Sequence, residues 1–447
     1  MLPATPSDPE TIYAVASGHG RSAIAVIRLS GSRTAAIVSA LIGTGPPEPR
    51  RLSLRRIRSP ESGEAIDQAM VVWLPGPSTF TGEDQAELQI HGGPAVKAAL
   101  LRALSGQPRC RPAEPGEFTR RAFLNGRLDL TEVEGLADLI EAETEAQRKQ
   151  ALRQLEGKLA SQVELWREGL IDALAWCEAG LDFTDEDDVP DDVADEATRS
   201  LLAIRDDVAA AVAAAGLGER LREGFTVVIA GPPNAGKSTL LNALARRDVA
   251  IVSPVAGTTR DAIEVRCDLG GLPVTLVDTA GLRDSENDVE REGIARAESR
   301  MASADLILWL TPVGDRTGIP DRAEPTRCSR VWTKSDLGQG VLQDDDGPVI
   351  SAATGAGLPE LLDLIKAEAV ALMGSGDDAL VTRERHRIAL AEVVDCLDRA
   401  LLLRQGQQSE LVAEDLRLAL RALGRMTGRV DVEEVLGRIF SAFCIGK

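Results

Sequence analysis

The stretch Gly231-Pro-Pro-Asn-Ala-Gly-Lys237-Ser238 decides the fold of the region around it. It follows the apolar run Phe225–Ala230 and opens the amphipathic segment Ser238–Leu244, so a strand, a glycine-rich loop and a helix are predicted in that order. Glycines let successive backbone N–H groups turn toward phosphate oxygens, and the helix N-terminus adds a partial positive charge. The stretch therefore predicts a phosphate-binding loop rather than an ordinary turn.

The side chains of this loop have the chemistry that a bound nucleotide and its metal require. Lys237 is expected to reach the β- and γ-phosphates, and the Ser238 hydroxyl is expected to ligate Mg²⁺. The loop residues predicted to contact the nucleotide are Asn234, Ala235, Gly236, Lys237, Ser238 and Thr239.

Two further motifs are expected at the metal and the γ-phosphate. The polar loop Gly257-Thr258-Thr259-Arg-Asp261 is suited to close on the nucleotide, with Thr259 as a second Mg²⁺ ligand. The strand Val274–Val277 ends in Asp278-Thr-Ala-Gly281, where Asp278 can hold Mg²⁺ through water and Gly281 can offer its N–H to the γ-phosphate. The predicted nucleotide contacts here are Ser253, Pro254, Val255, Ala256, Gly257, Thr258, Thr259, Asp278, Thr279, Ala280 and Gly281.

Two later motifs indicate that the base is guanine. The run Arg330-Val-Trp-Thr333-Lys334-Ser335-Asp336 places a carboxylate where it can accept two N–H bonds from guanine, which adenine cannot supply. The run Val349-Ile-Ser351-Ala352-Ala353 is the last loop on the base side. The predicted base-side contacts are Thr333, Lys334, Asp336, Ser351, Ala352 and Ala353.

The order of these motifs resembles that of the GTPases of the translation-factor-like class, with one departure. The guanine motif usually begins with Asn, and here it begins with Thr333. Asp336 is retained, so we expect guanine selectivity to survive. We expect a weaker brace between this loop and the phosphate-binding loop.

Composition narrows the class of protein. The chain has 447 residues, which suggests about three domains, and its formal charge of −20 argues against a general nucleic-acid coat while allowing local basic patches. No apolar run approaches the roughly 20 residues of a membrane helix, and the first residues do not have the pattern of a signal peptide. Six scattered cysteines without a CxxC pair predict reduced thiols and a cytoplasmic location.

The pattern of elements predicts a multidomain chain. Residues 10–120 are typical of a small α+β domain, whereas leucines at spacings of three and four over 152–181 predict one long helix. A second helix is expected over 194–215, and three more over 383–405, 409–426 and 431–443. The domains predicted are 1–125 (α+β), 126–217 (first half of a helical domain), 218–373 (an inserted Ras-like α/β domain) and 374–447 (second half). Two separate helical domains are the alternative.

The chain resembles the MnmE (TrmE) family of tRNA-modification GTPases. The motifs that carry this resemblance are Ile27-Arg28-Leu-Ser-Gly31, Phe80-Thr-Gly-Glu-Asp84, Leu88-Gln-Ile-His-Gly-Gly93, Pro115-Gly-Glu-Phe-Thr119, Arg121-Ala-Phe-Leu-Asn125, Leu128-Asp-Leu130 and the last residues, Phe443-Cys444-Ile445-Gly446-Lys447. The resemblance implies a cytoplasmic homodimer that works with tRNA and an FAD-dependent partner, MnmG (GidA). Together they would add a carboxymethylaminomethyl or aminomethyl group to C5 of the wobble uridine.

The same resemblance implies a folate site in the N-terminal domain. A 5-formyl- or 5,10-methylene-tetrahydrofolate would donate the one-carbon unit, bound by Arg28, Glu87 and Arg127, with Lys447 reaching the same site. The family often has Lys where this chain has Arg127, so the charge is kept while the geometry changes. Cys444 is either a nucleophile or proton donor, as the resemblance implies, or a small apolar residue.

The resemblance also implies how GTP would be hydrolysed. Leu282 follows Gly281, and its apolar side chain cannot orient water, so the family pattern assigns that role to Glu290. A K⁺ ion would supply the missing positive charge, held by Asn234 and the loop that carries Ser253, Val255 and Thr258. Hydrolysis would then be activated when two GTPase domains meet face to face.

A GTP-switch ribosome-assembly factor without modification chemistry is the alternative function. It would require a basic RNA-binding domain beside the GTPase. The acidic balance of the chain and the residues predicted for a folate site disfavour it.

Overall fold

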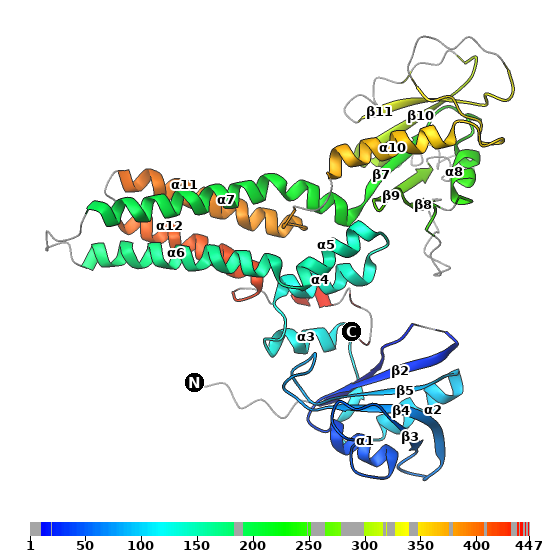
Figure 1. The fold of residues 1–447 in the computed structure, drawn as a ribbon, viewed down its shortest axis with the longest axis vertical. Helices are drawn as coiled ribbons and strands as arrows, with labels where there is room; N and C mark the ends of the chain where they lie inside the picture. Colours follow the sequence, from blue (N-terminus) through cyan, green and yellow to red (C-terminus); the bar gives the residue numbers. More distant parts are fainter. Residues whose placement is uncertain are drawn as a thin grey trace, which may run out of the picture. The chain divides into compact units, whose positions relative to one another are not determined.

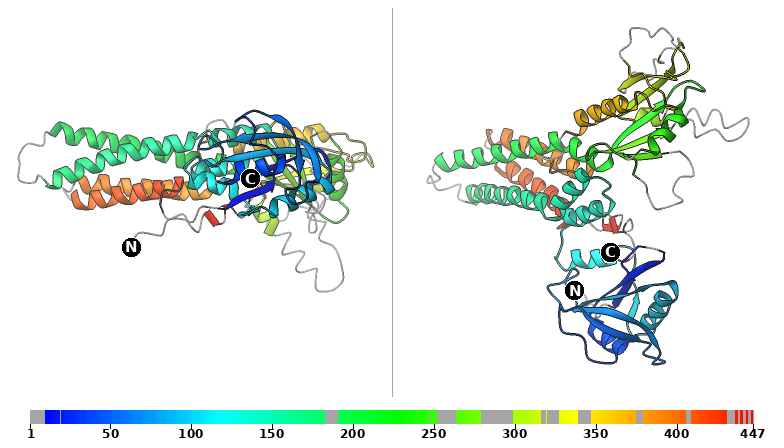
Figure 2. Two further views of the ribbon diagram at one scale, coloured as in Figure 1. Left: turned by 90° about the horizontal axis from the view of Figure 1, so that it is seen from below. Right: turned by 45° about the vertical axis from the view of Figure 1, so that its right-hand side comes forward.

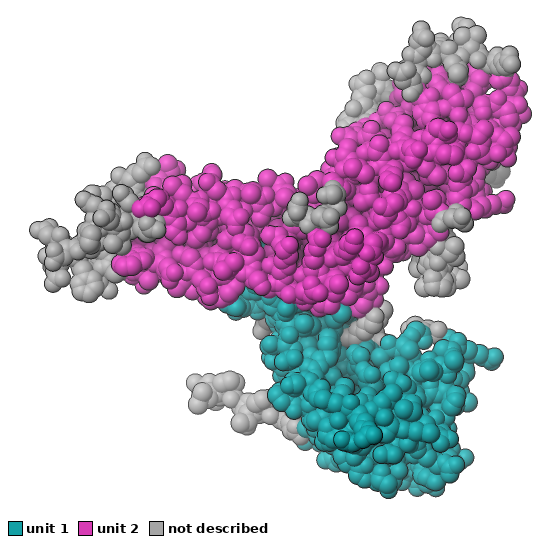
Figure 3. Space-filling model, viewed as in Figure 1, with its two compact units in different colours: residues 1–137, 424–447 teal, residues 138–423 magenta. Residues whose placement is uncertain are grey.

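The computed structural model describes most of the chain as two compact units (Figure 3). The N-terminal unit comprises residues 1–137 with 424–447, and the second unit comprises residues 138–423. The residues that the structure describes are 10–18, 20–182, 191–247, 249–251, 264–278, 299–315, 319, 327–338, 347–374, 379–405, 409–430, 436–437, 439–440, 443 and 446.

The N-terminal unit is built on a six-stranded sheet of order β3-β4-β5-β2-β1-β6 (Figure 1). The strands are β1 (Thr11–Val15), β2 (Ser22–Ser30), β3 (Ser53–Arg58), β4 (Ala65–Leu74), β5 (Gln85–Gly92) and β6 (Cys110–Pro112). Neighbouring strands are antiparallel except β1 and β6, which are parallel. Because side chains alternate between the faces of a strand, Ile27, Leu88 and Val71 share one face, where they pack with α1 (Thr34–Ile42) and α2 (Pro94–Ser105).

The opposite face of this sheet is covered near β1 by α3 (Glu117–Leu124). Phe118 of α3 is fully buried against Ile12 and Ala14 of β1. The helix α4 (Leu130–Glu141) follows, and its Val133 packs with Phe440 and Phe443 from the C-terminal part of the chain. The N-terminal sheet and the C-terminal residues therefore share one compact unit.

The helices of the second unit outside its α/β region come from two separate parts of the sequence. They are α5 (Glu145–Leu155), α6 (Lys158–Asp182), α7 (Asp191–Glu223), α11 (Glu384–Gln405) and α12 (Ser409–Thr427). The first three precede the α/β region and the last two follow it, yet α11 lies beside α7 in Figures 1 and 2. Ion pairs join the two groups, including Arg205 Nε to Asp398 Oδ1 at 2.8 Å and Arg417 Nη2 to Glu178 Oε1 at 2.8 Å.

The single helix expected over 152–181 is wrong, because the chain forms two helices there. The helix α5 ends at Leu155 and α6 begins at Lys158. Between them Gly157 has a φ of +78°, a left-handed conformation that interrupts the helical hydrogen bonds. The leucine spacing continues across this break, which is why periodicity alone did not reveal it.

The helix expected over 194–215 is longer than predicted. The helix α7 continues through two glycines to Glu223. At Gly218 a Cβ atom would lie 2.1 Å from the carbonyl oxygen of Val381, so this glycine permits a close backbone approach within the helix. The predicted boundary at residue 218 thus falls inside α7, and the other domain boundaries stay predictions. The third helix expected after residue 430 falls mostly outside the described residues.

The α/β region of the second unit has a five-stranded sheet of order β11-β10-β7-β9-β8. The strands are β7 (Phe225–Ala230), β8 (Glu264–Asp268), β9 (Pro273–Asp278), β10 (Leu306–Pro312) and β11 (Cys328–Thr333). Only β8 is antiparallel to its neighbour. The helices α8 (Lys237–Ala245) and α10 (Leu358–Met373) pack together on one face. The predicted combination of α+β, all-helical and P-loop α/β parts is confirmed.

The β8–β9 turn contacts the start of α5. The N–H of Ala146 donates to the carbonyl of Gly271 at 3.2 Å, and Arg266 Nη1 lies 2.8 Å from Glu143 Oε1. Thr144 and Gln147 form a capping box at the same helix end. No helix of the described residues is both long enough and apolar enough to span a membrane.

Two glycine substitutions should have opposite effects on stability. Gly157→Ala should destabilise the second unit by about 1–2 kcal/mol, because Ala is strained at a left-handed φ. Gly216→Ala, within α7 and facing open space, should stabilise it by about 0.5–1 kcal/mol through helix propensity. Urea unfolding followed by circular dichroism measures both. A stabilising Gly157→Ala would show that the break between α5 and α6 does not need a left-handed residue.

Candidate functional site

The phosphate-binding loop lies between β7 and α8, as predicted. Three of its residues have positive φ: Gly231 at +143°, Asn234 at +63° and Gly236 at +100°. At Gly231 a Cβ atom would lie 2.5 Å from the carbonyl oxygen of Leu310 on the neighbouring β10. Only glycine fits there, so the first glycine of the motif is required for packing the loop against the sheet.

The loop brings together an ammonium, a hydroxyl and a carboxylate. Lys237 Nζ donates to the carbonyls of Gly231 at 2.9 Å and Pro232 at 3.0 Å, which holds the positive charge over the loop. Ser238 Oγ donates to Asp278 Oδ2 at 2.7 Å. Asp278 is fully buried at the end of β9. Hydroxyl and carboxylate oxygens are the ligands that Mg²⁺ prefers, so this pair fits the predicted metal.

The guanine-side residues are held by two short hydrogen bonds. Thr333 Oγ1 donates to the carbonyl of Ala235 at 2.8 Å, and both groups are buried. A threonine hydroxyl therefore reaches the phosphate-binding loop directly, and the expectation of a weaker brace than Asn would give stays a prediction. Ser351 Oγ donates to Asp336 Oδ1 at 2.6 Å and so fixes the carboxylate. Lys334, which lies between Thr333 and Asp336 in the sequence, has a φ of +61°.

The two base-side loops are also joined through their backbones. The N–H of Ser335 donates to the carbonyl of Ile350 at 3.2 Å, and a β-bridge joins Trp332 to Val349. The run that contains Ala352 and Ala353 therefore begins beside the end of β11.

Several predicted site residues fall outside the described residues. They are Ser253, Pro254, Val255, Ala256, Gly257, Thr258, Thr259, Thr279, Ala280, Gly281, Glu290, Cys444 and Lys447. The ends of the first of these segments are described: the N–H of Ile251 donates to the carbonyl of Arg266 on β8 at 2.7 Å. The described residues on the two sides of this segment therefore lie next to each other.

The N-terminal sheet brings together two of the three residues predicted to contact folate. Arg28 on β2 and Glu87 on β5 are direct cross-strand partners. Arg28 Nη2 and Nε lie 3.0 and 3.2 Å from Glu87 Oε1, and both side chains are about a quarter exposed. The guanidinium also lies 5.9 Å from the ring centroids of Phe80 and Phe118. A carboxylate and a guanidinium are therefore presented together at a partly open surface.

Arg127, the third predicted contact, follows α3. Its N–H donates to the carbonyl of Ala122 at 2.8 Å, and its Cγ lies against Gly82, where an added Cβ would be 3.4 Å away. At the C-terminal end, Gly446 lies against β1, because its Cβ would be 2.4 Å from the carbonyl oxygen of Val15. The residue before Lys447 thus lies beside the strand that pairs with β2.

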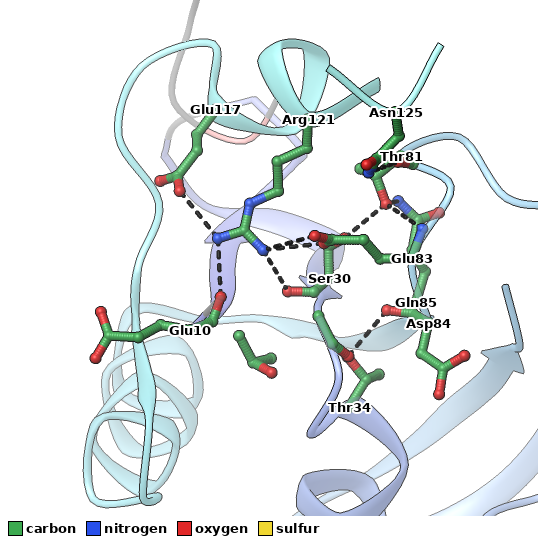
Figure 4. Close-up of polar contacts among 12 residues, drawn as sticks. Glu10, Ser30, Thr34, Thr81, Glu83, Asp84, Gln85, Glu117, Arg121 and Asn125 are labelled. Atoms are coloured by element: carbon green, nitrogen blue, oxygen red, sulfur yellow. Dashed lines mark hydrogen bonds and ion pairs between the residues drawn. The ribbon is translucent and has the colours of Figure 1, made fainter. Parts of the chain in front are cut away.

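A polar network for which the sequence suggested no role joins α3, the end of β2 and the loop between β4 and β5 (Figure 4). Arg121 of α3 lies at its centre and bonds to Glu83 at 2.9 Å, to Glu117 at 3.1 Å and to the carbonyl of Glu10 at 2.8 Å. Three of the family motifs contain Glu83, Glu117 and Arg121, but the sequence shows only the i, i+4 spacing of Glu117 and Arg121. The contact with Glu83, 38 residues away in sequence, appears only in the fold.

Comparison with known proteins gives matches over the whole chain. The model described as "GTP-binding protein TrmE N-terminus" matches residues 11–127, and the "MnmE helical domain" model matches residues 130–444. A protein of Methylorubrum populi named tRNA modification GTPase MnmE is 60% identical over 448 residues, with 100% of both chains covered. A protein of Rhodopseudomonas palustris with the same name is 52% identical, over 99% of this chain and 100% of its own.

Among solved structures, Era of Aquifex aeolicus is 24% identical and covers 38% of this chain and 66% of its own. Its TM-score of 0.26 by itself establishes no shared fold. The family models and the full-length relatives do not depend on that match: the chain belongs to the MnmE family of tRNA modification GTPases.

Proposed function

We propose that this chain binds and hydrolyses GTP and uses the reaction in tRNA modification. The observation that carries the proposal is the guanine-side geometry, in which Ser351 fixes Asp336 and Thr333 ties the same loop to Ala235 of the phosphate-binding loop. Full-length relatives named tRNA modification GTPase MnmE support the link to tRNA. In this proposal the chain acts in the cytoplasm.

The described residues would bind GTP through three contacts. Lys237 would turn its ammonium from the loop carbonyls to the phosphates, and Ser238 would release Asp278 to ligate Mg²⁺. Asp336, held by Ser351, would accept the two N–H groups of guanine. The helix N-terminus at α8 adds a favourable charge at the phosphates. Bound Mg²⁺ would neutralise charge on the phosphate oxygens.

Hydrolysis would use residues of the two loops outside the described residues. In the proposal Thr259 completes the Mg²⁺ site and Glu290 positions the attacking water. Asn234, together with Ser253, Val255 and Thr258, would hold a K⁺ ion. The left-handed backbone of Asn234 is compatible with this role, since Asn tolerates that conformation better than most residues. Two GTPase domains of a homodimer would meet to activate the reaction.

The N-terminal unit would bind the one-carbon donor, a 5-formyl- or 5,10-methylene-tetrahydrofolate. Glu87 would accept N–H groups of the pterin, while Arg28, Arg127 and Lys447 would attract the glutamate tail. The Arg28–Glu87 ion pair supports this, because it holds the carboxylate in one orientation before a ligand arrives. Cys444 would act near this site. With the FAD-dependent partner MnmG, the chain would add a carboxymethylaminomethyl or aminomethyl group at C5 of the wobble uridine.

Reconstitution tests the whole proposal. The purified chain, its flavoprotein partner, unmodified tRNA, GTP, a reduced folate and a nitrogen donor are incubated, and the tRNA nucleosides are analysed by mass spectrometry. The proposal requires a C5-modified wobble uridine that depends on GTP and folate. Modification that proceeds equally well without GTP, or none with all components present, would contradict it.

The Thr333 hydroxyl should matter for nucleotide affinity. Thr333→Val keeps the shape but leaves the carbonyl of Ala235 without this buried donor, which costs about 1–3 kcal/mol. GDP affinity should then fall roughly 5- to 150-fold at about 1.4 kcal/mol per decade. Titration of a fluorescent GDP analogue measures it, with Thr333→Ser as the control that keeps the hydroxyl. Equal affinities for all three proteins would show that the brace is dispensable.

GTP hydrolysis should require K⁺, because no arginine side chain is proposed for the missing positive charge. GTP turnover is compared in K⁺ and in Na⁺ at equal ionic strength. Equal rates would contradict a requirement for K⁺. Asn234→Gly should lose the stimulation by K⁺ and keep nucleotide affinity. It is a cleaner variant than Asn234→Ala, because glycine adopts the φ of +63° without strain.

Folate binding should depend on Glu87 and not on the GTP site. A charge-assisted bond contributes roughly 1.5–3 kcal/mol, so Glu87→Ala should weaken 5-formyl-tetrahydrofolate binding about 10- to 150-fold. Lys237→Ala is the matched control and should bind folate normally, since it lies in the other compact unit. Calorimetry measures the affinity of wild type, Glu87→Ala and Lys237→Ala for 5-formyl-tetrahydrofolate. Unchanged affinity in Glu87→Ala would remove Glu87 from the site.

A further inference from the structure

Arg28 lies close to two aromatic rings that do not belong to the sheet. Phe80 comes from the loop Pro75–Asp84, which joins β4 to β5, and Phe118 comes from α3. Each ring centroid is 5.9 Å from the guanidinium carbon. Cation–π attraction at this distance favours a guanidinium held close to the rings. The position of Arg28 therefore depends on how the loop and α3 are held relative to each other.

Two direct contacts hold the loop Pro75–Asp84 against α3 and the residue that caps its C-terminus. Arg121 Nη1 lies 2.9 Å from Glu83 Oε2, and Asn125 Nδ2 donates to the carbonyl of Thr81 at 2.7 Å. Ser30, at the end of β2, donates to Glu83 Oε2 at 2.7 Å, so the strand that carries Arg28 joins the same cluster. Figure 4 shows these side chains converging from the loop, the strand and the helix.

The same loop contacts Arg127. Gly82 has a φ of +80°, and an added Cβ would lie 3.1 Å from Asn125 Cβ and 3.4 Å from Arg127 Cγ. The stem of Arg127 therefore passes against the backbone of the loop. Of the three residues proposed to contact folate in the N-terminal sheet region, two touch this loop, Arg28 through Phe80 and Arg127 through Gly82.

The charges of this cluster are largely shielded from solvent. Arg121 is 9% exposed and Glu117 is 7% exposed, whereas the side chain of Glu83 is half-buried at 17%. Burial alone would raise the pKa of Glu117, but hydrogen bonds from Arg111, the Glu114 N–H and Arg121 lower that pKa below its usual value. Ion pairs of this kind add little net stability compared with apolar residues of the same volume. Their better-supported role is to specify one arrangement of the groups around them.

We propose that the Glu83–Arg121 ion pair positions the folate site. It fixes the loop Pro75–Asp84 on α3, so that Phe80 orients Arg28 and Gly82 supports Arg127. Neither Glu83 nor Arg121 touches the ligand in this proposal. The inference rests on the proposed function of the N-terminal unit and names further residues on which that function depends.

The test separates positioning from stability. Two variants are compared with wild type: Glu83→Gln, which keeps the shape and removes the charge, and the double variant Glu83→Leu with Arg121→Leu, which replaces the ion pair by apolar groups. Affinity for 5-formyl-tetrahydrofolate is measured by calorimetry, and the thermal midpoint is measured on the same samples. We expect affinity to fall about 5- to 50-fold in both, with a midpoint in Glu83→Gln close to that of wild type.

Three further variants sharpen the result. Arg121→Lys keeps the charge but cannot make all the bonds of the guanidinium, so its affinity should lie between wild type and Arg121→Gln. Arg111→Gln is the matched control: Arg111 bonds to Glu117 and Glu10, and among the described residues it has no hydrogen bond or ion pair with the loop, so folate affinity should be unchanged. GTP turnover should stay normal throughout.

The outcomes distinguish the two proposals. If wild type does not bind the folate, the proposed function of the N-terminal unit fails. If wild type binds and Glu83→Gln binds equally well while folded, the positioning role is wrong. If affinity falls only in variants whose thermal midpoint falls below the assay temperature, the pair is structural and the proposal is overturned.

Discussion

The packing of the second unit depends on the close approach of the Val381 backbone to Gly218 of α7. Val381 lies where the chain returns from the α/β region to the helices. Only a residue without a Cβ lets a backbone carbonyl come this near to a helix. The same short segment is fixed from two sides, because Thr382 Oγ1 donates to Gln154 Oε1 at 2.7 Å and Arg222 Nε donates to the Thr382 carbonyl at 3.1 Å. An α/β region can thus interrupt the helical sequence while α7 and α11 still pack together.

Sites formed by residues close together in the sequence could be predicted, whereas contacts between residues far apart in the sequence could not. The phosphate-binding loop could be predicted because strand, glycines and helix lie within about twenty residues of each other. The brace from Thr333 to Ala235 spans 98 positions, and no pattern around Thr333 shows where its hydroxyl points. The break at Gly157 was missed for a different reason. Hydrophobic spacing reports which face is buried and is insensitive to one residue of left-handed backbone.

The N-terminal unit shows how much the register of a sheet adds to a motif. The resemblance named Arg28 and Glu87 as separate ligand contacts, and the cross-strand register makes them partners of each other. Other family motifs contain Glu83 and Arg121, for which the sequence offered no role. Short motifs of this kind can mix residues proposed to contact a ligand with residues that hold those contact residues in place. Only the contacts distinguish the two groups.

The helix α7 has a mechanical consequence. Its 33 residues make a rod about 50 Å long, and after Gly224 it continues directly into β7, the strand that ends at the phosphate-binding loop. For a rod of that length, a small angular change at its base becomes a large displacement at its tip. A tilt of ten degrees, for example, would move the tip by roughly 9 Å, estimated from that rod length. One residue, Gly224, separates the long helix α7 from β7, the strand that ends at the phosphate-binding loop. Gly224 has a φ of +90°.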